Sequence, residues 1–154
     1  MRKMSHRMLS LAELRKLVSK MPFNSLVGLQ IHQGHKDGVT LRLAVETKLH
    51  NVAGTLHGGA MATLADAAAG MATFRHYGGR PITTVEMKIS YFRPVSEGLV
   101  YARARLVRTG ATLSVGQVEL RDARRNLLAI AIVTYLLLEA RGKEVAPSGS
   151  AKAT

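Results

Sequence analysis

The sequence contains no cysteine and no tryptophan, and aromatic residues make up only 5% of it. Without cysteine the chain can form neither disulfides nor thiolate metal sites, and we expect it in a reducing compartment such as the cytoplasm. Acidic residues are also scarce: 10 stand against 22 lysines and arginines, for a net charge of +12. Such an excess fits an anionic small ligand, a nucleic acid or an anionic membrane, and it also fits solubility alone.

A long apolar run is missing as well. The longest, Leu127 to Leu138, is shorter than the ~20 residues of a membrane-spanning helix, so we expect no membrane partner. The basic start, residues 1–9, lacks the apolar stretch of a signal peptide. The 154 residues fit one domain, expected over 10–139, between that basic N-terminal tail and a disordered C-terminal tail over 140–154.

The first third of the chain predicts one helix and two strands. Ser10 and Glu13 have the spacing of a capping box, and the apolar residues that follow recur at helical spacing. This short amphipathic helix should end at Pro22. We expect a first strand over 26–33 and a second, clearly alternating strand over 39–46.

The remaining sequence predicts one long helix and four strands. The helix, expected from about Gly59 to Tyr77, is apolar on all sides, so it should be buried on most of them. Four strands should follow, over 82–92, 100–108, 112–122 and 126–138. The last is apolar on both faces, which predicts a central or doubly covered strand. The fold class is therefore α+β, with an antiparallel sheet wrapped around one long helix.

Asp66 is the only charged residue of this helix between His57 and Arg75. Burying an unpaired carboxylate costs several kcal/mol, so it needs a partner or a proton. Small residues surround it at helical spacing, which predicts a shallow groove on that face of the helix. The alternative to a functional carboxylate is a structural ion pair, with Arg42 or Arg75 as its partner.

The start of the same helix offers a second chemical group. Gly58 and Gly59 lie where backbone N–H groups have no intrahelical partner. The Gly58 amide is suited to bind a carbonyl oxygen that gains negative charge. Eight residues of helix separate Gly58 from Asp66 by ~12 Å, too far for both to act on one carbonyl group. We therefore predict composite sites, in which Asp66 faces the Gly58 of a second subunit across a twofold axis.

The pattern N-x-x-G-x-x-H-G-G-x-x-x-x-L-x-D, from Asn51 to Asp66, is followed by TTVEMKISYFRP. Together these segments resemble the hotdog-fold acyl-CoA thioesterases, and in particular the phenylacetate-degradation-type and hydroxybenzoyl-CoA thioesterases. The similarity spans about 26–138. It implies a single hotdog domain that hydrolyses the thioester of an acyl-CoA or aryl-CoA.

The resemblance also implies roles for individual residues. The Gly58 amide, helped by Asn51, would polarise the thioester carbonyl, and Asp66 of the partner subunit would act as general base or as nucleophile. His57 would order this region or the sulfur of the leaving group, unless it is a capping residue. Thr84 would hold the attacking water, unless it is an ordinary strand threonine.

Substrate-binding residues follow from the same resemblance. The pantetheine arm would lie along the strand after the helix, and the phosphates near basic side chains. The implied set is Gly59, Thr63, Val85, Glu86, Met87, Lys88, Arg93 and Arg108. Coenzyme A belongs to the substrate, and no further cofactor or metal is implied. A homodimer is expected, pairing further into a tetramer. The acyl pocket should depend on Met61, Phe74, Met87 and Phe92.

Two other functions compete with hydrolysis. A hotdog protein could bind acyl-CoA without cleaving it. A basic nucleic-acid binder could use Arg103, Arg105 and the turn at 121–125, but the aromatic residues that stack on bases are scarce, so we expect no nucleic acid partner. A metal enzyme is disfavoured, because His50, His57 and His76 do not have the i, i+4 spacing of helical ligand pairs.

Overall fold

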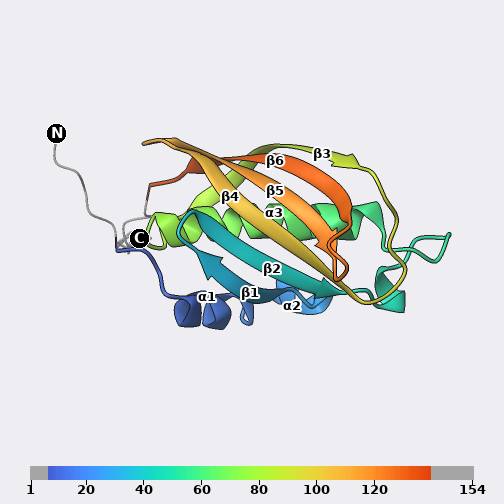
Figure 1. Cartoon of the computed structure of the whole chain (residues 1–154). Coiled ribbons are helices and arrows are strands. Elements are labelled where there is room, and N and C mark those ends of the chain that lie inside the picture. The colour runs from blue at the N-terminus through green and yellow to red at the C-terminus, as the bar shows by residue number, and fades with distance from the viewer. Residues whose placement is uncertain (1–6, 140–154) are drawn as a thin grey trace, which may run out of the picture.

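The computed structural model describes residues 7–139, in which a curved antiparallel sheet folds around a long helix (Figure 1). The helices are α1 (Leu11–Val18), α2 (Pro22–Val27) and α3 (Gly58–His76), with a short 3-10 turn, η1, at Thr47–Leu49. The strands are β1 (Gln30–His35), β2 (Gly38–Ala44), β3 (Ile82–Tyr91), β4 (Leu99–Thr109), β5 (Leu113–Asp122) and β6 (Leu127–Leu137). Residues 1–6 of the predicted N-terminal tail and the predicted tail at 140–154 lie outside the described residues.

The strand order in the sheet is β1-β2-β4-β5-β6-β3, and every neighbouring pair is antiparallel. The chain crosses from the β3 edge to the middle of the sheet between β3 and β4, while the other strand connections are hairpins or pass through α3. Among the described residues, β3 pairs only with β6, so its other edge carries free backbone groups.

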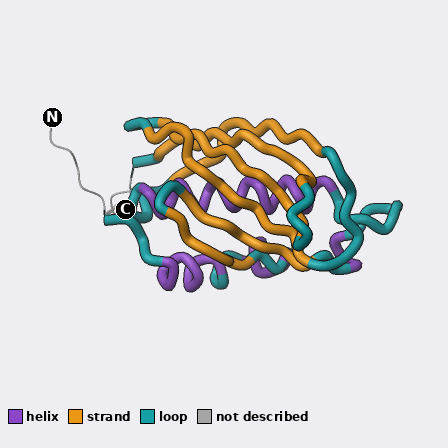
Figure 2. The backbone as a smooth tube through the Cα atoms, viewed as in Figure 1, coloured by secondary structure: helices purple, strands orange, loops and turns teal. Residues whose placement is uncertain are grey.

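Helix α3 runs along the concave face of the sheet (Figure 2). Its alanines keep it thin, and Leu64, Ala65, Ala68 and Ala69 are fully buried. A Cβ added at Gly116 of β5 would lie 3.1 Å from the Cβ of Ala69, so the sheet and the helix are already in close contact there. Small residues on both elements therefore let the sheet curl around the helix.

The predicted architecture is confirmed: an antiparallel sheet of six strands wraps a long central helix, and a short capped helix precedes it. The capping box of α1 is formed in both directions between Ser10 and Glu13. Its hydrogen bonds to the backbone and side chain of Ser10 lower the pKa of the Glu13 carboxyl.

The expected first strand at 26–33 is wrong in its first half. Pro22 does not only follow a helix; it begins α2, because proline at the first helical position has no N–H to leave unpaired. Gly28 ends α2 in the left-handed region, with φ of 85°. The strand therefore begins at Gln30.

Strand β3, at the edge of the sheet, differs from expectation in one further place. A bulge between Thr84 and Glu86 interrupts the alternation of β3, so Val85 is 52% exposed and does not continue the face of Met87. Strand β6 is an interior strand of the sheet, which confirms the prediction of a central strand. Its outer face is not covered by any of the residues that the structure describes, and Ile132 on that face is 38% exposed. Within residues 7–139, no helix has both the length and the apolar character needed to cross a membrane.

Candidate active site

The carboxylate of Asp66 is anchored by two hydroxyl groups. Oδ1 accepts a hydrogen bond from Thr84 Oγ1 of β3 at 2.9 Å and lies 2.6 Å from the hydroxyl of Tyr135 on β6. Thr84 and Tyr135 are cross-strand partners, so one register position of the sheet presents both donors to α3. In the single chain Asp66 is half-buried.

The structural ion pair considered for Asp66 is not formed. Arg42 donates from Nε to the side chain of Gln30. Arg75 donates to backbone carbonyls, including those of Leu9 and His35 at 3.0 and 2.7 Å. Neither guanidinium pairs with the Asp66 carboxylate.

Tyr135 is a site residue that the sequence patterns did not reveal, because it lies within an apolar strand and reads as core. It is 3% exposed. Burial, and then the neighbouring Asp66 carboxylate, raise the pKa of Tyr135 well above its usual value, so its hydroxyl stays protonated and donates. The one available signal was a single tyrosine among aliphatic residues, since buried tyrosine hydroxyls need a polar partner.

At the start of α3, His57 is the N-cap residue. Its Nδ1 accepts a hydrogen bond from the Gly59 N–H at 2.9 Å, so the capping role weighed for this histidine is what the free chain shows. The Gly58 N–H has no acceptor among residues 7–139. The Gly58 carbonyl accepts from the Tyr91 hydroxyl at 2.8 Å, which ties the end of β3 to this end of the helix. A free amide at a helix N-terminus can bind a developing negative charge.

The side chain of Asn51 orders the loop before α3. Its Oδ1 accepts from the backbone N–H groups of Ala53 and Thr55 at 3.0 and 3.2 Å, and its amide donates to the Thr55 hydroxyl. This loop projects from one end of the molecule (Figure 1), with Val52 fully exposed. In the single chain, the hydrogen bonds of the Asn51 side chain therefore stabilise the loop that carries it.

Two cavities lie along the α2 side of α3. One, of about 240 Å³, contains Asp66 and Tyr135 and is otherwise mostly apolar. The other, of about 270 Å³, lies at the start of α3 beside His57 and Gly59. Phe23 and Thr63 line both, so the cavities adjoin along the helix. Thr63 donates its hydroxyl to the Gly59 carbonyl at 2.9 Å.

The candidate phosphate-binding side chains do not form one cluster. Lys88 stands opposite Ile132 on the outer face of the sheet. Arg93 follows β3 at the end of the molecule where α3 begins. Arg108 lies near the end of β4, beside the start of β5 and the C-terminal end of α3. Of the four residues expected to shape the acyl pocket, Met61 is buried in the core and Phe92 is 59% exposed, and none of the four lines either cavity.

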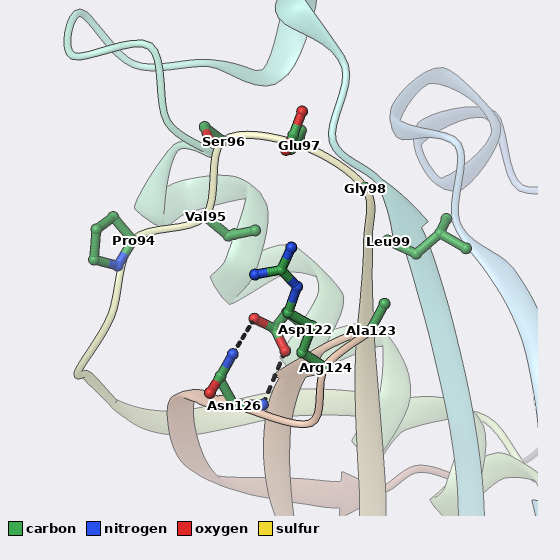
Figure 3. A pocket seen from close by; sticks show the side chains of 10 residues that line it. All are labelled: Pro94, Val95, Ser96, Glu97, Gly98, Leu99, Asp122, Ala123, Arg124 and Asn126. Atoms are coloured by element: carbon green, nitrogen blue, oxygen red, sulfur yellow. Dashed lines mark hydrogen bonds between the residues drawn. The ribbon is translucent and has the colours of Figure 1, made fainter.

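A larger cavity, of about 440 Å³, lies between the β3–β4 crossover and the β5–β6 turn (Figure 3). Its charged lining residues are Glu97, Asp122 and Arg124, and Asp122 accepts hydrogen bonds from the side-chain and backbone nitrogens of Asn126, both at 2.8 Å. These hydrogen bonds lower the pKa of Asp122. The contacts close a turn, and Asp66 is absent from this cavity. The volume of a cavity therefore does not identify the candidate active site. Among residues 7–139, no group of three or more His, Asp or Glu side chains is arranged to hold a metal ion.

Comparison with known proteins gives a consistent answer. The family model described as Thioesterase superfamily matches residues 53–129, which include Asp66 and the start of α3. This chain belongs to the Thioesterase superfamily. Acyl-coenzyme A thioesterase 13 of Mus musculus is 31% identical over 73% of this chain and 83% of its own length. The medium/long-chain acyl-CoA thioesterase YigI of Escherichia coli is 26% identical over 78% of this chain and 88% of its own.

The fold has solved counterparts. The crystal structure of a thioesterase from Haemophilus influenzae superposes with a TM-score of 0.82, over 90% of this chain and 97% of the other, at 23% identity. That likeness confirms the hotdog fold. Membership of the superfamily makes this chain a thioester hydrolase, which favours hydrolysis over the binding-only alternative.

Proposed function

We propose that this thioesterase hydrolyses the thioester of an acyl-CoA or aryl-CoA at composite sites shared by two subunits. Asp66 of one subunit takes a proton from water, or attacks as a nucleophile, and the Gly58 amide of the other subunit polarises the carbonyl. As general base, Asp66 accepts the proton while the water oxygen bonds to the carbonyl carbon. The oxyanion so formed is held by Gly58 and then collapses to release the acid and the CoA thiolate.

The observation that carries this proposal is the environment of the Asp66 carboxylate. Asp66 is the only charged residue of α3 before Arg75, it is anchored by neutral hydroxyl groups instead of a cation, and it lines a mostly apolar cavity. A carboxylate kept only for stability would be expected to pair with one of the chain's many arginines. The names of the two relatives above, Acyl-coenzyme A thioesterase 13 and YigI, give acyl-CoA as their substrate. The net charge of +12 suits a ligand with several phosphates.

The dimer is supported by the free edge of β3. This ten-residue strand ends in exposed aromatic residues, Tyr91 at 47% and Phe92 at 59%. A long edge of this kind is a template for pairing with another strand. Pairing β3 with its twofold-related copy would continue the sheet and set the two α3 helices antiparallel, which directs Asp66 of one subunit toward Gly58 of the other. Exposed Leu113 and Ile132 on the outer face of the sheet are where we propose that two dimers form a tetramer.

Within the family, the aspartate in the T-L-A-D segment and the full motif from Asn51 support a place beside the phenylacetate-degradation-type and hydroxybenzoyl-CoA thioesterases. The acyl group, on this proposal, occupies the cavities that adjoin at Phe23. The remaining candidates, His57, Thr84, Lys88, Arg93 and Arg108 among them, keep their proposed roles in ordering the site, holding water and binding the CoA moiety.

The test measures thiol release from aryl, short-chain and long-chain acyl-CoAs by wild type and Asp66→Asn. Asparagine keeps an oxygen for Thr84 and Tyr135, so the fold should survive, while kcat should fall by about 10²- to 10⁴-fold as expected for loss of a general base. Glu119→Gln on the outer face, where Glu119 binds Arg121, is the matched control and should retain full activity. An Asp66→Asn enzyme within twofold of wild type would refute the proposal.

A further inference from the structure

The two oxygens of the Asp66 carboxylate are in different environments. Oδ1 receives the hydroxyls of both Thr84 and Tyr135, and among residues 7–139 no donor reaches Oδ2. The Tyr135 hydroxyl is also hydrogen-bonded to the Asp66 backbone carbonyl. Tyr135 therefore binds both the side chain and the backbone of one residue, which fixes the rotamer of that side chain as well as its place on the helix.

Gly70 allows the Tyr135 hydroxyl to come this close to Asp66. It lies one helical turn after Asp66, on the same side of α3. A Cβ at position 70 would stand 2.9 Å from the Tyr135 hydroxyl oxygen and 3.3 Å from the adjoining ring carbon. The ring is part of the packed core, so it could not move aside without disturbing β6. The glycine thus makes room for the hydroxyl to reach Asp66.

We propose that Tyr135, admitted by Gly70, is a positioning residue that holds Oδ1 of Asp66 so that Oδ2 is the oxygen that reacts. This inference rests on the proposed function, because it assigns Tyr135 a role only through the chemistry of Asp66. As a base, Oδ2 takes the proton from the water whose oxygen bonds to the carbonyl carbon. As a nucleophile, Oδ2 bonds to that carbon while the C–S bond breaks and the CoA thiolate leaves, and water then hydrolyses the resulting anhydride to the free acid and the Asp66 carboxylate. In both cases Oδ1 stays hydrogen-bonded. The hydroxyl keeps its own proton throughout.

Among residues 7–139, the side chains that line the cavity around Asp66 carry no competing charge. Helix α2, strand β3 and strand β6 face it across the cavity, and α3 carries it. The residues that these elements present there are Met21, Phe23, Asn24, Ile82, Thr84 and Tyr135, with Thr63, Ala67, Gly70 and Met71 from α3. Apart from Tyr135, none of them titrates. Removing a donor from a carboxylate disfavours its ionised form, so the loss of the Tyr135 hydroxyl should move the acid limb of the pH profile to higher pH.

The experiment compares Tyr135→Phe with Tyr77→Phe. Tyr77 also has a partly buried hydroxyl that donates to a backbone carbonyl, that of Gly110 at 2.8 Å, but it lies at the C-terminal end of α3. We expect Tyr135→Phe to lower kcat by about tenfold to a hundredfold, as for loss of one hydrogen bond to a charged group. KM should change less than threefold, and the acid limb of the pH profile of kcat/KM should move to higher pH. Tyr77→Phe should leave kcat and the limb in place.

Gly70→Ala is the second variant. Its methyl group should displace the Tyr135 hydroxyl and reproduce both effects, and it keeps the proposal testable if Tyr135→Phe fails to fold. A Tyr135→Phe enzyme with kcat within twofold of wild type would overturn the inference, and so would a loss of activity with an unmoved acid limb. If Asp66→Asn is inactive while Tyr135→Phe is unaffected, only this inference fails. If Asp66→Asn is active, the proposed function fails with it.

Discussion

At the scale of single residues, the proposed site depends on one backbone group, the Gly58 amide, as much as on side chains. Gly58 exposes an N–H group at the start of α3, and its absent side chain leaves that group open to a ligand. His57 occupies the neighbouring Gly59 amide, so only the Gly58 amide is free at this point of the described chain. The proposed catalytic geometry thus combines a carboxylate held by hydroxyl groups with an amide that has no acceptor among residues 7–139.

Gly58→Pro should remove that amide with little effect on the fold. Proline is favoured at the first position of a helix, and His57 before it has φ of −60° and ψ of 137°, a conformation compatible with a following proline. A Cβ at Gly58 meets Tyr91 only at the ordinary distance of 3.5 Å. We expect kcat to fall about 10²- to 10³-fold, as for loss of one oxyanion donor, with a nearly unchanged thermal midpoint.

Gly58→Ala is the control for this measurement, because it adds a methyl group but keeps the N–H. Comparable losses in the alanine and proline variants would show that steric access, and not hydrogen bonding by the amide, explains the effect.

At the scale of elements, α3 and the strands that wrap it were predictable from the sequence, and α2 and the bulge in β3 were not. The helix propensity of the Ala, Met and Leu residues and the length of their run specify α3, and period-two alternation specifies most of the strands, because these are local properties. Helix α2 has only six residues and no apolar period of its own, so Val27 and the residues after it read as a strand. The role of Tyr135 depends on a register between β3 and β6, which a single sequence does not encode locally.

Helix α2 should influence which acyl groups are accepted. Phe23 lines both cavities, of about 240 and 270 Å³, and is 58% exposed. Phe23→Ala would join them, so kcat/KM for bulky or long acyl-CoAs should rise relative to short ones by about tenfold or more, the effect of a few methylene contacts. Leu26→Ala, on the same helix but lining neither cavity, should leave the ratio unchanged. An unaltered ratio in Phe23→Ala would place the acyl group elsewhere.

At the scale of the whole molecule, the proposed composite site needs a second copy of the chain. The free edge of β3 and the distance along α3 between Gly58 and Asp66 both point to a twofold partner. Lysine on an exposed edge strand opposes pairing, so Val85→Lys should weaken the dimer. Activity per subunit should then fall on dilution in parallel with the dimer fraction seen by sedimentation, and recover at high protein concentration. A monomeric variant with full activity would contradict this.

The most direct measurement mixes inactive Gly58→Pro subunits with inactive Asp66→Asn subunits and follows thiol release after subunit exchange. A hybrid dimer contains one site with both groups intact, because the Asp66 of one chain faces the Gly58 of the other. With random exchange, half of the dimers are hybrids and half of their sites work, so about a quarter of wild-type activity should return. No recovery, with hybrid dimers demonstrated in the sample, would contradict a site shared between subunits.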